Sequence, residues 1–460
     1  SKTILASFVK GHKSDRFPNA PTGIAFTGDR GVPDGVRKPD RNNFAPRLGL
    51  AWDPFGKGKM VVRAGGGLYY AYPPLGIVEQ LTAIVAAPTL TGANASLSNP
   101  WGTSHSNSGD TILQYPAGMP SFDPSPAKRT WQPSDITGFS PDARTPYQWQ
   151  FNVGVQRQLI SGLKIVAGYV GNRAKKGWAV RDNNLALWQP NANTGNVNAR
   201  RPNQTWRAIN LISTDVNDSY DAAEVAATLS KKSLYVRMIY TLRRFLTSAG
   251  NGGQEVGIDN SPAAWASNPR NVRGDIAPVV PRQQVRGFLH YQLPKFSKNR
   301  WMKYGLEGWL VSSSFTWYDG DRLNVILGSD YNYDGFAGDR PDQIGSIHYV
   351  RKQQGGILTW IDKNAFASPP TPSVDNPYPF GNLPRNAVRG PNHISLGAAI
   401  MKNFPLREKY RLLLRLDTSN LLNHPNWSNP VMNVSRSDFG LIQTKEGGGR
   451  VIQIQARLAF

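Results

Sequence analysis

The sequence predicts an all-β fold: an antiparallel transmembrane β-barrel with about twelve strands in this chain and long loops on one side. Apolar and polar residues alternate with period two through many segments, and short and long connections alternate between those segments. The chain of 460 residues has a mean hydropathy of −0.43 and no run of about eighteen apolar residues, so a transmembrane helix is not expected. Any membrane crossing would use strands.

The last residues, 450–460, alternate most strictly. Ile452, Ile454, Leu458 and Phe460 fall on one face, and polar side chains occupy most of the other. This pattern is typical of a strand with lipid on one side and an aqueous lumen on the other, and it resembles the terminal strand of a bacterial outer-membrane barrel. We interpret these four residues as a membrane-insertion signal, although the edge strand of a soluble sandwich could alternate in the same way.

Further strands are expected in pairs joined by short turns, and each pair reads as a hairpin. The expected pairs are residues 44–52 with 60–70, 147–158 with 163–171, 222–229 with 234–245, 283–293 with 304–317, and 396–403 with 410–421. One more strand is expected at residues 4–8.

Long segments rich in Pro, Gly, Asn and Asp separate these hairpins. They are residues 12–43, 71–146, 172–221, 246–282, 318–393 and 423–449. A barrel with short periplasmic turns and long extracellular loops requires this order, whereas a soluble sandwich or propeller has no reason for it. We therefore expect residues 1–460 to form the C-terminal part of an outer-membrane barrel with these six loops outside the cell.

The charge and the reactive residues limit the function classes. Lys and Arg number 53 against 31 Asp and Glu, but they are spread along the chain, so we expect contact with outer-membrane lipid and anionic lipopolysaccharide and no nucleic-acid partner. Cysteine is absent and the six histidines are isolated. Because no catalytic motif is present, we expect no enzyme.

One loop motif has the spacing of a calcium site. Asp330, Asn332 and Asp334 form D-x-N-x-D-G, which places oxygen ligands around Ca²⁺, and Asp339 and Asp342 could complete the shell. The bidentate Glu of an EF-hand is missing. The alternative is an Asx-rich turn whose side chains cap their own backbone.

Tryptophans in the long loops are candidate ligand contacts. Trp101, Trp131, Trp188, Trp206 and Trp360 could stack on a ligand such as a sugar face. The alternative, which we favour, is that these rings anchor the loops by burial.

Several segments in fixed order resemble one known family. They are RFPNAP at 16–21, NNFAPRLGLAWDPFGKGK at 42–59, TPYQWQFNVGVQRQL at 145–159, GDRPD at 338–342, FGNLPRNAVRGP at 380–391 and DTSNLLNHPNW at 417–427. With the aromatic terminus, they resemble the C-terminal barrel portion of large TonB-dependent receptors. The resemblance is to the Oar-like type with a carboxypeptidase-regulatory-like N-terminal domain, which is common in Acidobacteria.

The resemblance implies a barrel of about 22 strands that is filled by an N-terminal plug and imports bulky ligands with energy relayed by the TonB system. This sequence carries about half of those strands and neither plug nor TonB box. We therefore expect an N-terminal barrel and plug portion as partner, through which TonB would act. The alternative function is a surface structural or adhesion protein that the barrel anchors. The ligand is left open.

Overall fold

The computed structural model describes eleven stretches of the chain. They are residues 6–15, 22–33, 40–71, 135–140, 143–248, 275–276, 281–294, 304–335, 338–377, 379–407 and 410–460. No helix within these stretches is both long enough and apolar enough to cross a membrane.

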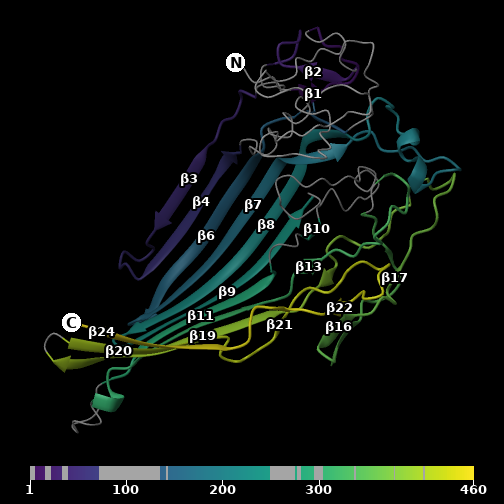
Figure 1. Cartoon of the computed structure of the whole chain (residues 1–460). Coiled ribbons are helices and arrows are strands. Elements are labelled where there is room, and N and C mark those ends of the chain that lie inside the picture. The colour runs from purple at the N-terminus through teal and green to yellow at the C-terminus, as the bar shows by residue number, and fades with distance from the viewer. Residues whose placement is uncertain are drawn as a thin grey trace, which may run out of the picture.

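One large antiparallel sheet dominates the structure (Figure 1). Its eleven consecutive strands are β3 (Arg47–Trp52), β4 (Met60–Tyr70), β6 (Tyr147–Ile160), β7 (Leu163–Asp182), β8 (Ile209–Lys231), β9 (Leu234–Thr247), β11 (Gln283–Gln292), β12 (Leu310–Tyr318), β19 (His393–Arg407), β20 (Tyr410–Ser419) and β24 (Val451–Ala459). The short strands β5 (Ile136–Phe139) and β10 (Asp275–Ile276) pair with β8 and β9. The predicted all-β class and the five predicted hairpins are confirmed.

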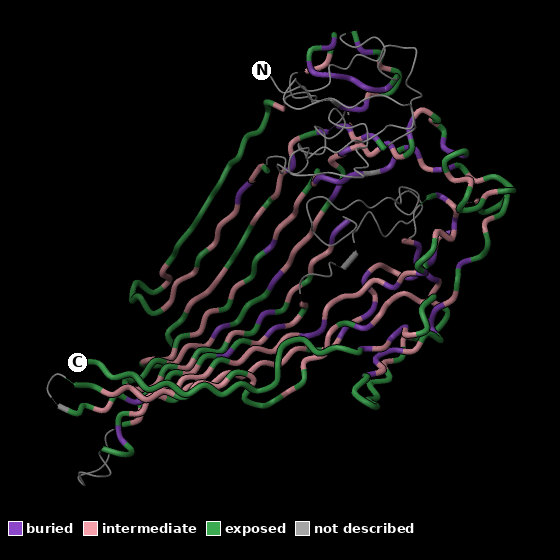
Figure 2. The backbone as a smooth tube through the Cα atoms, viewed as in Figure 1, coloured by how far each residue is buried: buried purple, intermediate pink, exposed green. Residues whose placement is uncertain are grey.

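The register carries one apolar face across the sheet. One row of paired residues runs Val62, Val155, Ala167, Val225, Tyr240, Val285, Trp317 and Ile394. The next row, on the opposite face, runs Arg63, Gly154, Gly168, Glu224, Thr241, Gln284, Tyr318 and His393. Many large apolar side chains of the first face are exposed, so no described part of the chain covers them; in Figure 2 the strands of the sheet are coloured mostly as intermediate or exposed.

The connections fall on two sides as the sequence predicts. The short connections from β3 to β4, β6 to β7, β8 to β9 and β19 to β20 lie together with the C-terminus at the lower left of Figure 1. The described parts of the long connections lie at the opposite ends of the strands. This arrangement is that of an up-and-down membrane barrel.

The strand predicted at residues 4–8 is wrong as a barrel strand. β1 (Ala6–Phe8) pairs with β2 (Ile24–Phe26) in a separate two-stranded sheet. Phe8 is buried there in a cluster with Ile136 and Trp206, outside the barrel wall. The edge of the large sheet is therefore β3.

The loop predicted at residues 172–221 is too long. β7 continues to Asp182 and β8 begins at Ile209, so the connection spans residues 183–208, with short 3₁₀ turns η1 (Thr194–Asn196) and η2 (Asn198–Arg200). Beyond the bilayer a strand needs no apolar face, so its backbone ladder continues where the period-two signal stops.

The described parts of two long loops, between β12 and β19 and between β20 and β24, contain small sheets that share a core. Their strands are β13 (Arg322–Leu323), β14 (Asp342–Gln343), β15 (Tyr349–Gln354), β16 (Ile357–Ile361), β17 (Phe366–Ala367), β18 (Val388–Arg389), β21 (Asn426–Trp427), β22 (Leu441–Ile442) and β23 (Lys445–Glu446). Val325, Leu383 and Val388 are fully buried in one shared cluster. These two loops therefore fold together around one core.

Candidate functional site

A groove of about 870 Å³ lies on the polar face of the sheet, across β9, β11, β12, β19 and β20. Its floor is made of small residues: Ser314 pairs with Gly397, and Ser312 pairs with Ala399. A Cβ atom on Gly397 would lie 3.3 Å from the Ser314 side chain, so a larger residue would crowd this floor. Small residues here leave the space that larger neighbours enclose.

Basic side chains border the groove on both sides. Arg237 and Arg286 come from β9 and β11, and Arg415 comes from β20. Arg415 donates two hydrogen bonds of 2.6 Å to the carboxylate of Asp417, so that guanidinium is neutralised by its neighbour. The opposite border keeps its positive charge, which suits an anionic group on whatever occupies the groove.

The same sign of charge extends over the whole polar face. In the register of the eleven strands, the basic residues on this face are Arg47, Arg63, Lys164, Arg237, Arg243, Arg286, Arg411, Arg415 and Arg457. The acidic ones are Asp218, Glu224 and Asp417. The face is therefore a polar wall with a net positive charge.

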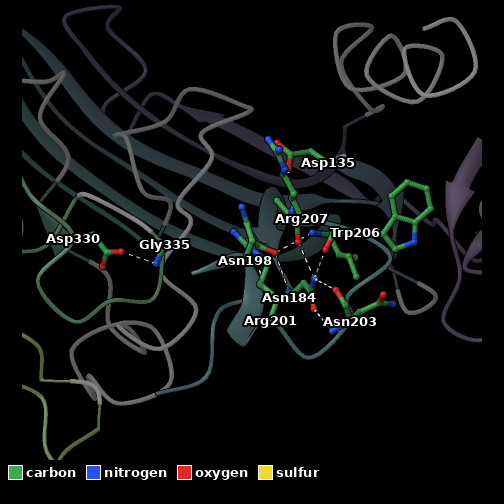
Figure 3. Close-up of polar contacts among 12 residues, drawn as sticks. Asp135, Asn184, Asn198, Arg201, Asn203, Trp206, Arg207, Asp330 and Gly335 are labelled. Atoms are coloured by element: carbon green, nitrogen blue, oxygen red, sulfur yellow. Dashed lines mark hydrogen bonds and ion pairs between the residues drawn. The ribbon is translucent and has the colours of Figure 1, made fainter. Parts of the chain in front are cut away.

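A second pocket, of about 440 Å³, lies among the long loops (Figure 3). Its lining includes the charged residues Asp135, Asp182, Arg201, Arg207 and Asp330. These residues come from the end of β7, from the connection between β7 and β8, from the segment before β5 and from the loop after β13. The pocket mixes carboxylates with guanidinium groups, so it suits a polar ligand and not an apolar one.

One buried asparagine fixes the wall of this pocket. Asn184 is 1% exposed, and its Nδ2 donates to the backbone carbonyls of Asn203, Trp206 and Arg207 at 2.9, 3.1 and 2.7 Å. Its Oδ1 accepts a hydrogen bond of 2.8 Å from the backbone N–H of Asn203. The side chain thus ties the two ends of the connection together, as the dashed lines of Figure 3 show.

A buried ion pair lies beside that asparagine. Arg201 Nη1 donates to Asp182 Oδ2 at 2.7 Å and to the carbonyl of Asn184 at 2.6 Å. Asp182 Oδ1 accepts from the backbone N–H groups of Asn184 and Ile209, at 2.8 and 2.9 Å. Because these charges are enclosed and satisfied, the pocket wall is built before any ligand arrives.

Apart from Asp330, which was predicted as a calcium ligand, these pocket residues were not singled out from the sequence. The contacts of Asn184 span 19 to 23 residues, and Asp135 and Asp330 come from distant segments. The signal in the sequence is only a run of Asp and Asn after a strand, which also fits an ordinary turn.

The predicted calcium ligands Asp330 and Asn332 bind backbone amides in this structure. Asp330 accepts from the N–H groups of Asp334 and Gly335, at 3.0 and 2.9 Å, and Asn332 Oδ1 accepts from Asp334 N–H at 3.0 Å. Burial raises the pKa of Asp330. This geometry is that of the alternative, the Asx-rich turn.

Of the other three predicted ligands, Asp334 is fully buried, and Asp339 and Asp342 accept hydrogen bonds from backbone amides. Asp339 Oδ2 accepts from the N–H groups of Tyr331 and Asn332, and burial raises the pKa of Asp339 to about 6. Asp342 Oδ1 accepts from Asn382 N–H at 2.8 Å. In the described part of the chain, no group of three or more His, Asp or Glu residues is arranged to hold a metal ion. Calcium binding stays a prediction.

Three of the five predicted ligand tryptophans lie within the described loops, buried to different depths. Trp206 is 2% exposed and its Nε1 donates to the Thr22 carbonyl at 3.4 Å, whereas Trp188 is half-buried. Trp360 is 8% exposed and its Nε1 donates to the Arg389 carbonyl at 2.7 Å. The burial of Trp206 and Trp360 fits loop anchors better than ligand contacts.

Trp101 and Trp131 lie outside the described residues. The predicted insertion signal lies on the edge strand β24, where Ile452, Ile454 and Leu458 are more than half exposed on the apolar face, next to β20. Phe460 follows β24 and is 93% exposed.

Residues 3–453 match the family model described as outer membrane beta barrel domain. This chain belongs to that family. It is therefore a protein of the bacterial outer membrane, its apolar face meets lipid, and its long loops lie outside the cell. No curated protein sequence matches the chain.

Three solved outer-membrane proteins are similar to this chain at low identity. The outer membrane transporter YddB of Escherichia coli is 10% identical, with a TM-score of 0.46 over 91% of this chain and 40% of its own. The ferric enterobactin receptor PfeA of Pseudomonas aeruginosa is 12% identical, with a TM-score of 0.43 over 91% and 40%. The FrpB iron transporter of Neisseria meningitidis is 9% identical, with a TM-score of 0.39 over 91% and 39%. The chain spans about two fifths of these proteins.

Proposed function

We propose that this chain forms the C-terminal part of the barrel of a TonB-dependent receptor of the Oar-like type, which binds a bulky ligand outside the cell and imports it. The transport route would run along the polar face, and the loop pocket would contribute to capture. The import energy would reach the barrel through a plug and a TonB box carried by an N-terminal portion.

The direction of the edge strands is the observation that carries this proposal. All neighbours along the eleven-strand path are antiparallel, so β3 and β24 run in the same direction. If these edges paired directly, they would form a parallel seam, whereas membrane barrels of this kind are antiparallel throughout. Antiparallel closure needs an odd number of additional strands, and about eleven would give the 22 of the receptor family.

The polar face supports a filled lumen. Its groove has small residues on the floor and basic residues on the border, and the whole face carries nine basic against three acidic residues. Such a wall would be matched by an acidic surface of a plug or by an anionic ligand.

The proposal is tested in native cells with and without the gene. Uptake of ferric enterobactin, vitamin B12 and maltohexaose is measured, each with and without a protonophore. We expect energy-dependent uptake of at least one probe to be lost with the gene and weakened by Arg237→Gln with Arg286→Gln. The purified native protein should conduct no ions in planar bilayers, because a plug fills the lumen. A permanently conducting barrel without further strands would refute the proposal.

A second function is favoured by the folded loops. The cluster around Val325, Leu383 and Val388 gives the extracellular part a core of its own, which a surface structural or adhesion protein would also need. If deletion of the gene abolishes cell attachment and leaves uptake of every probe unchanged, the anchor function is the correct one.

A further inference from the structure

Basic side chains gather on the lipid-facing side of β6 to β9, level with the extracellular end of β6 at Tyr147. We call Arg173, Lys175, Lys176 and Arg244 the rim cluster. Arg173 pairs with Trp149 and Lys175 pairs with Tyr147, on the same face as Val153 and Val155. Arg244 pairs with Asp221 of β8, which pairs in turn with Gly171 of β7. The cluster therefore continues the apolar face upward.

A β-bulge brings the two lysines to this face. The register between β7 and β8 shifts between Ala174 and Gly177, and Lys176 has a φ of 56°, a left-handed conformation that non-glycine residues rarely adopt. Lys176 Nζ lies 5.6 Å from the centre of the Tyr147 ring. In a regular strand, consecutive residues would face opposite sides, so the bulge redirects one side chain.

The depth of the cluster matches the outer boundary of the membrane. Arg173 is ten residues beyond Leu163, which begins β7 at the short-turn side. At about 3.3 Å per residue and a tilt of about 40°, this places it roughly 25 Å above the turn, which is about the height of the apolar band of such barrels. The exposed rings of Trp149, Phe151 and Tyr169 lie next to it, as an interfacial girdle requires.

One acidic residue accompanies the four basic ones. Asp221 accepts hydrogen bonds from the Tyr169 hydroxyl and, at 2.8 Å, from Arg173 Nη2. Below the bulge, it is the one acidic residue on the lipid-facing side of the paired stretches of β6 to β9. Arg173 is thereby held in place, and Lys175, Lys176 and Arg244 are exposed beside it. The cluster keeps a net positive charge directed outward from the barrel.

We propose that the rim cluster binds the phosphorylated head group of the glycolipid in the outer leaflet. The side chains face lipid and not the lumen, so a membrane component is the partner they can reach. Guanidinium and ammonium groups at this depth complement phosphate, and the aromatic rings beneath them pack against the adjoining acyl chains. This binding is independent of ligand import, so either proposal can fail without the other.

The test measures lipid binding by the purified full chain with native mass spectrometry in detergent. The probes are bisphosphorylated lipid A and the same lipid without its phosphates. The rim variant Lys175→Gln, Lys176→Gln, Arg244→Gln keeps the Arg173–Asp221 pair. Each charge removed should weaken the binding of bisphosphorylated lipid A about fivefold. The triple variant should therefore bind this lipid on the order of 100-fold more weakly than the wild type. Lys175→Arg with Lys176→Arg should bind as the wild type does.

The matched control removes three charges from the opposite rim, with Arg157→Gln, Lys231→Gln and Lys232→Gln. It should bind lipid A like the wild type, and heat-modifiable gel mobility checks that both triple variants fold. Equal binding of the two lipids, or equal losses in both triple variants, overturns the proposal. Displacement of lipid A by equimolar inorganic phosphate also overturns it, because the site would then recognise free phosphate and not a lipid.

Discussion

Val155 and Gln156 are adjacent residues of β6 that face opposite sides of the wall. Val155 lies in the apolar row between Val62 and Ala167, and Gln156 pairs with Val61 and Val166 on the polar face. Val155 is about five residues from the turn, which places it roughly 13 Å above that turn and close to the middle of the apolar band. The two residues thus lie on the same strand and at the same depth in the membrane. Val155 faces lipid, whereas Gln156 faces the polar side of the wall.

An arginine at these two positions should have unequal costs. At the bilayer midplane on the lipid face it costs about 2–4 kcal/mol, so Val155→Arg should lower the free energy of unfolding by that amount. Gln156→Arg places the charge on the polar face, which is in contact with water. This substitution should change the free energy of unfolding by about 0.5 kcal/mol.

The assay is urea unfolding of the protein folded into phosphatidylcholine vesicles, followed by tryptophan fluorescence and gel mobility. Equal losses of stability in Val155→Arg and Gln156→Arg would refute the assignment of the two faces. A larger loss for Gln156→Arg would reverse it, because the polar face would then be the packed one.

Three further predictions concern the loops. Trp206→Ala should destabilise the extracellular part by about 3–5 kcal/mol because it leaves a cavity at a buried site. Trp188→Ala should destabilise it less, because Trp188 is only half-buried. Limited proteolysis of the connection between β7 and β8 measures both losses. Asp182→Asn leaves the Arg201 charge buried without its partner and should cost about 3–5 kcal/mol in the same assay. If the calcium prediction is correct, equilibrium dialysis of the full chain should show millimolar Ca²⁺ binding that Asp330→Asn removes; absence of binding in the wild type refutes it.

The strands of the barrel wall were predictable because lipid on one side of each strand requires apolar residues at every second position. A residue within the bilayer faces either hydrocarbon or the lumen, so β6, predicted at residues 147–158, is found at Tyr147–Ile160. β20, predicted at residues 410–421, is found at Tyr410–Ser419. The turns follow from the same rule, since a hairpin must reverse where the apolar band ends.

The extracellular part was less predictable because no such rule holds in water. The upper part of β8 includes Asn210, Asp215 and Asn217, a composition that suggests a loop, yet it forms a ladder with β7. The small core around Leu383 draws on segments far apart in the sequence, as does the pocket beside Asn184. Such contacts depend on tertiary packing, which periodicity does not encode.

The positions of the basic residues on the two faces of the sheet explain why the chain carries a net positive charge. Along the lipid-facing rows of β6 to β9, charged residues occur near the two boundaries of the apolar band, as with Arg157 and Arg173, where their head groups reach water or lipid phosphates. On the polar face they occur along the whole height of the wall, from Arg411 up to Arg243. A nucleic-acid partner would require these charges on one accessible surface. Their division between an enclosed lumen and a membrane rim fits two separate anionic partners, one inside the barrel and one in the outer leaflet.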